Sequence, residues 1–136
     1  GNFVLQRKDQ LFSYQLAVVV DDAQQKISHI IRGSDLYQQT PQQVWLQACL
    51  DYKQPSYGHL PIIINGQGQK LSKQNLATPL DMLQAPALMS EALERLGHPA
   101  PCGLRQAPVA EQLEWAAGQW DIECVPKRMQ DPIAFV

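Results

Sequence analysis

The sequence predicts a mixed α/β fold with a parallel sheet, followed by a small helical tail. An apolar strand, a capped helix and a second apolar strand follow one another between residues 27 and 64. This strand–helix–strand order is typical of a parallel sheet. After about Thr78 the apolar residues recur instead at helical spacing. We therefore expect two parts, residues 1–78 and residues 79–136.

The N-terminal segments favour short elements. Residues 3–6 (FVLQ) read as a strand, and the polar residues 7–10 as a turn. Residues 16–20 (LAVVV) are ambiguous, since β-branched residues favour a strand but the length and flanks also suit a buried helix. Residues 27–32 read as a strand that Gly33 closes.

A helix is expected to begin at Thr40. Threonine can cap a helix, Pro41 suits the first helical position, and Gln43 completes a capping box. The helix should run to about residue 52 and then give way to a turn at residues 54–58. Its predicted buried side consists of Val44, Ala48, Cys49 and Tyr52.

The tail should fold as a helical hairpin. Pro86 opens a helix that Gly97 ends, and a proline-rich connection, residues 98–108, leads to a second helix. Trp115 and Trp120 are expected to be core or helix-contact residues rather than a base-stacking platform. The predicted buried faces are Leu88, Met89, Ala92, Leu93 and Leu96 in the first helix, and Val109, Leu113, Ala116 and Trp120 in the second.

Composition limits the classes of function. The formal net charge of −2 argues against a strongly basic nucleic-acid-binding module. Cys49, Cys102 and Cys124 are widely spaced and odd in number, so a zinc knuckle or disulfide framework is not expected, and we interpret them as reduced core thiols. No apolar run approaches the ~20 residues that span a bilayer. We expect a cytoplasmic protein.

A polar loop follows the most apolar strand. The strand LPIII, residues 60–64, leads into GQGQKLSKQN, residues 66–75. Glycines let a backbone approach an anion, and lysine, serine and backbone N–H groups are donors for phosphate. The Walker A pattern does not fit, because the second glycine does not stand directly before Lys70 and the serine is displaced. On residue types alone the loop is either a phosphate-binding loop or an ordinary solvated one.

Several motifs in order resemble one enzyme family. KLSKQ, residues 70–74, resembles the KMSKS signature of class I aminoacyl-tRNA synthetases. SYQLAVVVDD, ISHIIRGSDL, TPQQ and HLPIIIN are similar to the glutamyl-tRNA synthetase branch. The glutamine after KLSK and the short tail resemble glutamyl-Q tRNA(Asp) synthetases in particular. The resemblance runs from about Phe3 to Asn75, and more loosely to Pro126. It also implies that LAVVV is helical.

The resemblance implies an ATP-dependent ligase. L-glutamate would be activated with ATP and Mg²⁺ as glutamyl-adenylate, then transferred to queuosine in the anticodon of tRNA(Asp). Lys73 would be catalytic, neutralising charge on the leaving pyrophosphate. Arg32 and Tyr14 would bind the glutamate, the arginine through a planar two-point contact with a carboxylate. The implied ATP-binding residues are Lys70, Leu71, Ser72, Lys73 and Gln74.

The rest of the family pattern is not found. None of the three histidines lies in a HIGH-like motif, and the cysteine-rich zinc module is absent. The resemblance therefore implies the second half of a Rossmann-like class I catalytic domain, with residues 79–136 as a stem-like appendage. We expect zinc only in the missing N-terminal half. An isolated fragment should be inactive, and its open sheet edge should favour self-association.

Two alternatives remain open at this stage. The chain could be a fragment of an ordinary glutamyl-tRNA synthetase, although arginine usually follows the second lysine there. It could also be a non-catalytic RNA- or protein-binding module that kept the fold. We interpret Asp21 and Asp22 as a helix end or turn rather than as a metal-binding pair. Asp35 is either a helix cap or a nucleotide contact. The segment 131–136 matches nothing, and His29, His59 and His98 are interpreted as structural.

Overall fold

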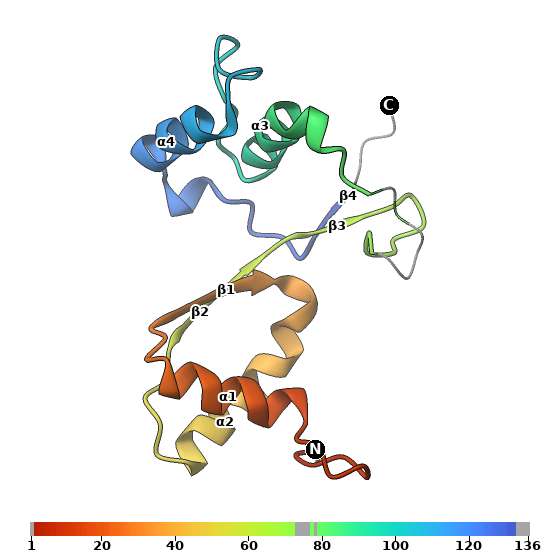
Figure 1. The fold of residues 1–136 in the computed structure, drawn as a ribbon, viewed down its shortest axis with the longest axis vertical. Helices are drawn as coiled ribbons and strands as arrows, with labels where there is room; N and C mark the ends of the chain where they lie inside the picture. The colour runs from red at the N-terminus through yellow and green to blue at the C-terminus, as the bar shows by residue number, and fades with distance from the viewer. Residues whose placement is uncertain (1, 73–76, 78, 133–136) are drawn as a thin grey trace. The chain divides into compact units, whose positions relative to one another are not determined.

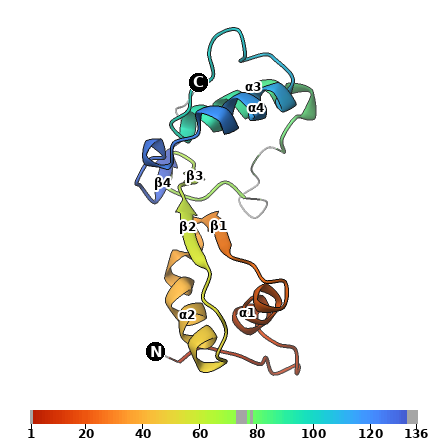
Figure 2. The ribbon, with the colours of Figure 1, turned by 90° about the vertical axis from the view of Figure 1, so that its left-hand side faces the viewer.

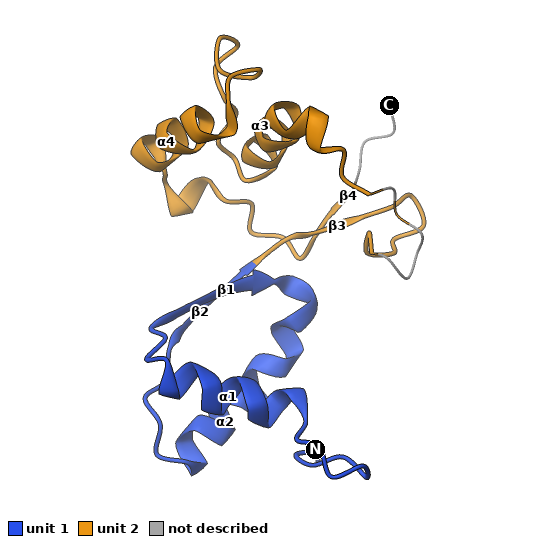
Figure 3. Ribbon diagram, viewed as in Figure 1, with its two compact units in different colours: residues 1–59 blue, residues 60–136 orange. Residues whose placement is uncertain are grey.

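A computed structural model describes residues 2–72, 77 and 79–132, and its helices and strands are labelled in Figure 1. The chain forms two compact units, residues 1–59 and residues 60–136 (Figure 3). Helices and short strands occur in both. The predicted mixed α/β class is confirmed.

The first unit pairs two helices with a small sheet. Helix α1 (Tyr14–Gln24) packs along α2 (Thr40–Cys49), and β1 (His29–Gly33) pairs with β2 (Ser56–Leu60) (Figure 1, Figure 2). LAVVV lies inside α1, so its helical reading is confirmed. The buried apolar side chains are few, namely Val19 from α1 and Leu46 from α2.

The start of α2 differs from the expected capping box. A 3₁₀ helix, η1 (Ser34–Gln39), runs directly into α2, so Thr40 is already helical, with φ −57° and ψ −46°. No side chain caps α2, and the hydroxyl of Thr40 and the amide of Gln43 instead bond to Arg32. The capping-box prediction is wrong because a helical residue precedes the proline and the polar side chains have another partner.

The buried face and the end of α2 also differ from prediction. The helix ends at Cys49, three residues before Tyr52. Its buried residues are Gln43, Leu46 and Gln47, whereas Ala48 and Cys49 are exposed. A face that buries two glutamines has no apolar pattern in the sequence, so the periodicity selected the wrong side.

Pro61 divides the strand predicted at residues 60–64. Proline cannot donate a backbone hydrogen bond to a neighbouring strand. The residues before it belong to β2, which starts at Ser56 inside the predicted turn, and those after it form β3 (Ile62–Ile64). Strand β2 pairs with β1, and β3 pairs in parallel with β4 (Gln130–Pro132). One predicted strand therefore serves two sheets.

The N-terminal strand prediction is wrong. Residues 3–6 contribute only an isolated antiparallel bridge between Gln6 and Phe12. The polar turn between them is real: Gln10 has a φ of 68°, and the Arg7 amide donates to the Leu11 carbonyl at 2.8 Å.

The second unit is built around the predicted helical hairpin. Helix α3 (Ala85–Arg95), preceded by the 3₁₀ helix η3 (Met82–Gln84), packs on α4 (Val109–Gln119) (Figure 2). Gly97 ends α3 with a φ of +81°, as expected. A Cβ there would lie 2.0 Å from the Cys124 carbonyl oxygen, next to η4 (Ile122–Cys124), so the position requires glycine.

The buried face of α4 contains a glutamine. Gln112 is 0% exposed and donates through Nε2 to the carbonyls of Pro86 and Ala107, both at 2.9 Å. Leu113, predicted to be buried, is half exposed. Trp120, 43% exposed, stacks on the buried ring of His98 with centroids 4.4 Å apart. Ala116 is buried as predicted, but Gln112 takes the core position expected of Leu113, and its amide joins α4 to the start of α3.

The three thiols do not lie in the core. Cys49, Cys102 and Cys124 are free and exposed, which corrects the expectation of core thiols. Cys49 and Cys124 are the last residues of short helices, and Cys102 begins a turn. Within residues 2–72, 77 and 79–132, no helix is long and apolar enough to cross a membrane.

Candidate functional site

Arg32 lies near the end of β1, and three neutral side chains hold its guanidinium. Nη1 donates to Oε1 of Gln43 and Nη2 to Oγ1 of Thr40, both at 2.8 Å. Nε donates to Nε2 of His59 at 3.4 Å, a longer contact. The acceptors come from α2 and β2, so the strand and the helix together fix the plane of the guanidinium.

His59 must be neutral to accept from Arg32. A guanidinium nitrogen can only donate, so Nε2 carries the lone pair and Nδ1 the proton. Burial, and then the charge of Arg32, lower the pKa of His59 below its ordinary value. The Thr40 hydroxyl lies 3.0 Å from the same Nε2. The histidine interpreted as structural is therefore part of the arginine's immediate surroundings.

Gln43 is in turn fixed by a second amide. Its Nε2 donates to Oε1 of Gln15 in α1 at 2.8 Å, which leaves its own Oε1 facing Arg32. Gln15 donates to Oε1 of Gln42 at 2.8 Å and of Gln39 at 3.2 Å. Gln43 is 1% exposed. Because a buried amide without partners is costly, this chain of amides has one favourable orientation.

Aromatic rings cover part of the same group. The Arg32 guanidinium carbon lies 5.1 Å from the centre of the Tyr57 ring, a cation–π distance. Gln47 donates to the Tyr57 hydroxyl at 2.8 Å. The rings of Tyr37 and Tyr57 both lie against His59. The rings stabilise the positive charge without neutralising it.

The guanidinium keeps both charge and donors. In the described part of the chain Arg32 forms no ion pair, and its hydrogen-bond acceptors are an amide, a hydroxyl and an imidazole. Three of its five N–H groups are engaged, which leaves two, one on each terminal nitrogen. A planar pair of donors with an unneutralised charge suits a carboxylate.

The acidic residues nearby do not form a metal site. Asp21 and Asp22 lie in the last turns of α1, as the helix-end reading predicted. Burial, and then the charge of Asp21, raise the pKa of Asp22, while Arg32 opposes the rise. Among the described residues no group of histidines, cysteines and carboxylates could hold a metal ion. Asp35 lies in the first turn of η1.

Tyr14 is not brought into this cluster. It is the first residue of α1 and is half exposed. Within the described residues its hydroxyl has no hydrogen bond with Arg32. Its neighbour Gln15 is the residue of α1 that reaches the arginine's surroundings.

The second unit contains the described part of the polar loop. Asn65 organises the turn, since its Oδ1 accepts from the amides of Gln67 and Gln69, both at 2.9 Å. Gly68 has a φ of +76°, which favours glycine. Lys70 bridges back to Ile64, and the Leu71 amide donates to the Ile63 carbonyl at 2.9 Å. The loop thus begins as a tight reversal beside β3.

Lys70, Leu71 and Ser72 line one shallow hollow. Apolar residues form the rest of its wall, namely Ile62, Ile63, Ala77, Pro79 and Leu80. Lys73 and Gln74, the predicted catalytic lysine and its neighbour, lie outside the described residues. Of the predicted site residues that the structure describes, Tyr14 and Arg32 belong to the first unit, and Lys70, Leu71 and Ser72 to the second.

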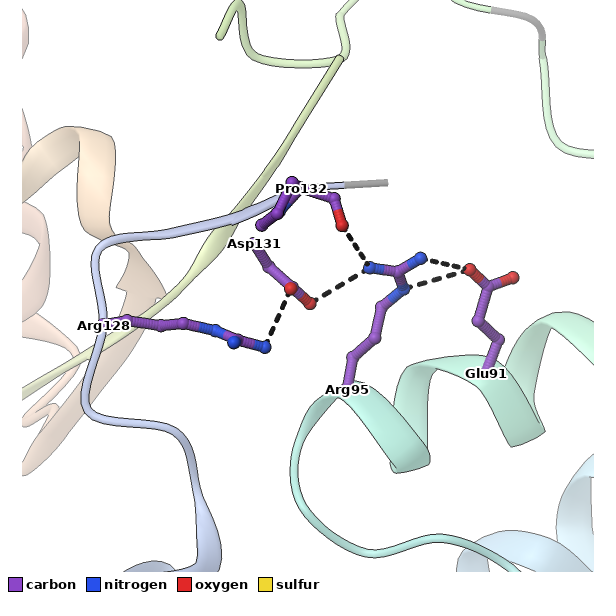
Figure 4. Close-up of polar contacts among 5 residues, drawn as sticks. All are labelled: Glu91, Arg95, Arg128, Asp131 and Pro132. Carbon is purple, nitrogen blue, oxygen red and sulfur yellow. Dashed lines mark hydrogen bonds and ion pairs between the residues drawn. The ribbon is translucent and has the colours of Figure 1, made fainter. Parts of the chain in front are cut away.

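Sequence reasoning missed most of the surroundings of Arg32. Gln15 and Gln43 read as ordinary polar residues, and His59 as structural. The one available signal was Gln43 in TPQQ, which the capping-box interpretation explained instead. Asp131, in a segment that matched nothing, is 7% exposed and is bound by Arg95 and Arg128 (Figure 4).

The chain is similar to proteins of one family. The family described as "tRNA synthetases class I (E and Q), catalytic domain" matches residues 1–100. A glutamyl-Q tRNA(Asp) synthetase of Synechococcus sp. is 55% identical over 116 residues, which are 85% of this chain and 39% of the relative. One of Thiobacillus denitrificans is 51% identical over 126 residues, 93% of this chain and 42% of the relative.

The fold agrees with a solved structure. A glutamate tRNA ligase from Elizabethkingia meningosepticum, crystallised in complex with its amino acid, superposes with a TM-score of 0.65 at 20% identity. The match covers 96% of this chain and 29% of that one. The chain therefore spans about two-fifths of the curated relatives that it matches and less of the solved structure.

Fold, ordered motifs and identity of about one half over most of the chain lead to the same conclusion. The chain is a homologue of glutamyl-Q tRNA(Asp) synthetases and belongs to the class I tRNA synthetase family for Glu and Gln, within its catalytic domain.

Proposed function

We propose that this chain is part of an ATP-dependent synthetase that activates glutamate and transfers it to queuosine in the anticodon of tRNA(Asp). Residues 1–78 would be the second half of its Rossmann-like catalytic domain, and residues 79–136 a stem-like appendage. The names of the 51–55% identical relatives support this choice over an ordinary glutamyl-tRNA synthetase.

The observation that carries the proposal is the state of Arg32. Its guanidinium is held by neutral groups and keeps two N–H donors and a positive charge. A carboxylate of glutamate would take both donors in a two-point contact. Tyr14, half exposed at the start of α1, would supply a hydroxyl to the amino acid.

The loop would hold the nucleotide. Lys70, Ser72 and backbone amides beyond Leu71, whose own N–H donates to Ile63, would contact the phosphates of ATP, which would bind as its Mg²⁺ complex. In the first step a glutamate carboxylate oxygen attacks the α-phosphorus, and pyrophosphate leaves. Lys73 would neutralise the charge that develops on the pyrophosphate. In the second step a hydroxyl of the queuosine ring attacks the adenylate, and AMP leaves.

The remaining walls of the site would come from sequence that this chain does not contain. Catalysis depends on positioning both substrates, so we expect the chain alone to be inactive.

The test is glutamate transfer with the site completed. The chain is mixed with the unmatched remainder of the Synechococcus relative, ATP, radioactive glutamate and tRNA(Asp) containing queuosine. We expect labelled tRNA from the mixture, none from either part alone, and none from tRNA(Asp) lacking queuosine.

Two results would redirect the proposal. Labelling of tRNA(Glu) instead would assign the chain to an ordinary glutamyl-tRNA synthetase. No labelling by a mixture that forms a stable complex, as judged by gel filtration, would favour a non-catalytic module.

A further inference from the structure

The two remaining N–H donors of Arg32 have a fixed direction only if the guanidinium cannot rotate. Its three acceptors differ in how firmly they are themselves held. Thr40 can rotate its hydroxyl between His59 and the Leu36 carbonyl, 3.0 and 3.5 Å away. The contact to His59 is the longest of the three. Gln43 is the firm one, because its amide is buried and bonded at both ends.

The orientation of the Gln43 amide is set from another helix. Gln15 accepts from its Nε2, and Gln15 is oriented by donating to Gln42 and Gln39. If the Gln43 amide turned over, its Nε2 would face a guanidinium, which cannot accept, and two buried hydrogen bonds would be lost. The carbonyl oxygen therefore stays on Arg32.

Gln43 is also neutral, and that decides what Arg32 can still bind. A glutamate at the same place would give the guanidinium a carboxylate at the same distance and cancel its charge. The wall around Arg32 instead consists of amides, a hydroxyl, an imidazole and the Tyr57 ring. The charge remains for a ligand.

We propose that Gln43, oriented by Gln15, is the positioning residue that fixes the two remaining N–H donors of Arg32 for a carboxylate ligand and, by being neutral, preserves the affinity for it. The ligand class rests on the proposed function; the positioning does not. Gln43 itself does not touch the ligand.

The experiment uses the 136-residue chain and the side-chain NMR signals of Arg32. A held guanidinium gives resolved, slowly exchanging Nε–H and Nη–H signals. We expect these signals in the wild type and their collapse to an averaged Nη signal in Gln43→Ala, with the backbone spectrum still dispersed. Unchanged Arg32 signals in Gln43→Ala would overturn the positioning role.

Charge is tested by titrating L-glutamate into the chain mixed with the unmatched remainder of the Synechococcus relative, while following the Arg32 signals. Gln43→Glu should weaken glutamate binding by about tenfold or more, because the new carboxylate neutralises the guanidinium. Gln38→Glu, which adds the same charge at an exposed position of η1, should change it by no more than about twofold. Equal affinity in Gln43→Glu and wild type would overturn the proposal.

The two hypotheses fail in different ways. If wild-type Arg32 is rigid but glutamate causes no shift even with the remainder of the Synechococcus relative present, the glutamate site of the proposed function is contradicted while the positioning by Gln43 stands. If glutamate binds and Gln43→Ala leaves both affinity and Arg32 signals unchanged, the positioning role is wrong and the proposed function stands.

Discussion

Each unit contains a partly buried arginine, and the two are held in opposite ways. Arg32 in the first unit bonds to an amide, a hydroxyl and an imidazole. Arg95 in the second unit bonds to carboxylates, with Nη2 2.7 Å from Glu91 and Nη1 3.1 Å from Asp131 (Figure 4). Asp131 also binds Arg128 at 2.8 Å.

The difference separates a structural arginine from one available to a ligand. Hydrogen bonds from Arg95, first to Glu91 and then to Asp131, raise its pKa, and they tie α3 to β4. Arg32 is also held by three side chains, but in the described part of the chain no carboxylate forms an ion pair with it, and the charge of Asp22 acts on it without a hydrogen bond. Burial alone does not distinguish Arg32 from Arg95, but the charge of their hydrogen-bond partners does.

The largest effect should come from removing the shared carboxylate of the second unit. Asp131 is 7% exposed, and Asp131→Ala leaves Arg95 with Glu91 and the Pro132 carbonyl. It also removes the carboxylate that the half-exposed Arg128 side chain binds. We expect a loss of roughly 2–3 kcal/mol in the stability of the second unit. Amide hydrogen exchange in β3 and β4 measures it, and unchanged exchange in β1 and α2 is the control.

Replacing Arg32 by lysine should affect binding more than folding. An ammonium cannot reach three acceptors in one plane, so Arg32→Lys should cost about 1 kcal/mol of stability in the first unit. Glutamate binding should fall by about tenfold or more, because the two-point contact is lost.

Arg95→Lys is the matched control for that variant. It retains a cation beside Glu91 and Asp131 and should leave glutamate binding unchanged. Isothermal calorimetry measures the glutamate affinity of both variants. Equal losses of affinity would contradict the distinction between the two arginines.

Acid should weaken the first unit before the second. The pKa of His59 is lowered by burial and by Arg32, so the unfolded chain binds a proton there at a higher pH than the folded chain. The stability of the first unit should therefore be full above about pH 6.5 and decline as the pH falls from there through the folded pKa. The other groups against His59 are Thr40 and the rings of Tyr37 and Tyr57.

His59→Gln isolates that effect. The raised pKa of Asp22 acts with the opposite sign, adding stability as the pH falls toward its ordinary value near 3.8. The pH slope between 7.5 and 5.5, from hydrogen exchange in β1 and α2, should therefore vanish in His59→Gln. A slope that persists would assign the acid sensitivity to another group.

The smallest effect should come from an ion pair that is fully exposed. Lys127 and Glu123 lie 2.6 Å apart, but their side chains are 77% and 71% exposed. Lys127→Ala should change stability by no more than about 0.5 kcal/mol, and less in high salt. Urea denaturation at low and high salt checks this, and a loss near that of Asp131→Ala would break the contrast between buried and exposed pairs.

The sequence was informative where one apolar pattern or one special residue decides the structure. The helical hairpin of the tail and the stop at Gly97 were predicted, since proline and glycine mark helix ends for backbone reasons. For LAVVV, the β-branched composition favoured a strand, and only the resemblance to the family predicted the helix that the structure has. Leu93 and Ala116 are buried as predicted, but other core positions were missed because they hold Gln43, Gln47 and Gln112, where periodicity leads one to expect apolar residues.

Prediction of the candidate site from the sequence was limited in the same way. Arg32 was identified by resemblance, but its partners come from three stretches of chain, and no spacing in the sequence joins Gln15, Gln43 and His59. Amides look alike in a sequence whether they face solvent or a guanidinium. Asp131 was missed for a simpler reason, because its role depends on β4 returning to β3.

The pairing of β4 with β3 affects the order in which the chain folds. Ile63 pairs with Asp131, roughly seventy positions later in the sequence, and contacts so distant form late because the intervening chain must first be closed into a loop. During synthesis, β3 and the reversal at Asn65 leave the ribosome long before their partner strand exists. We expect the base of the KLSKQ loop to be among the last parts of the second unit to become ordered, when the helical hairpin is already folded.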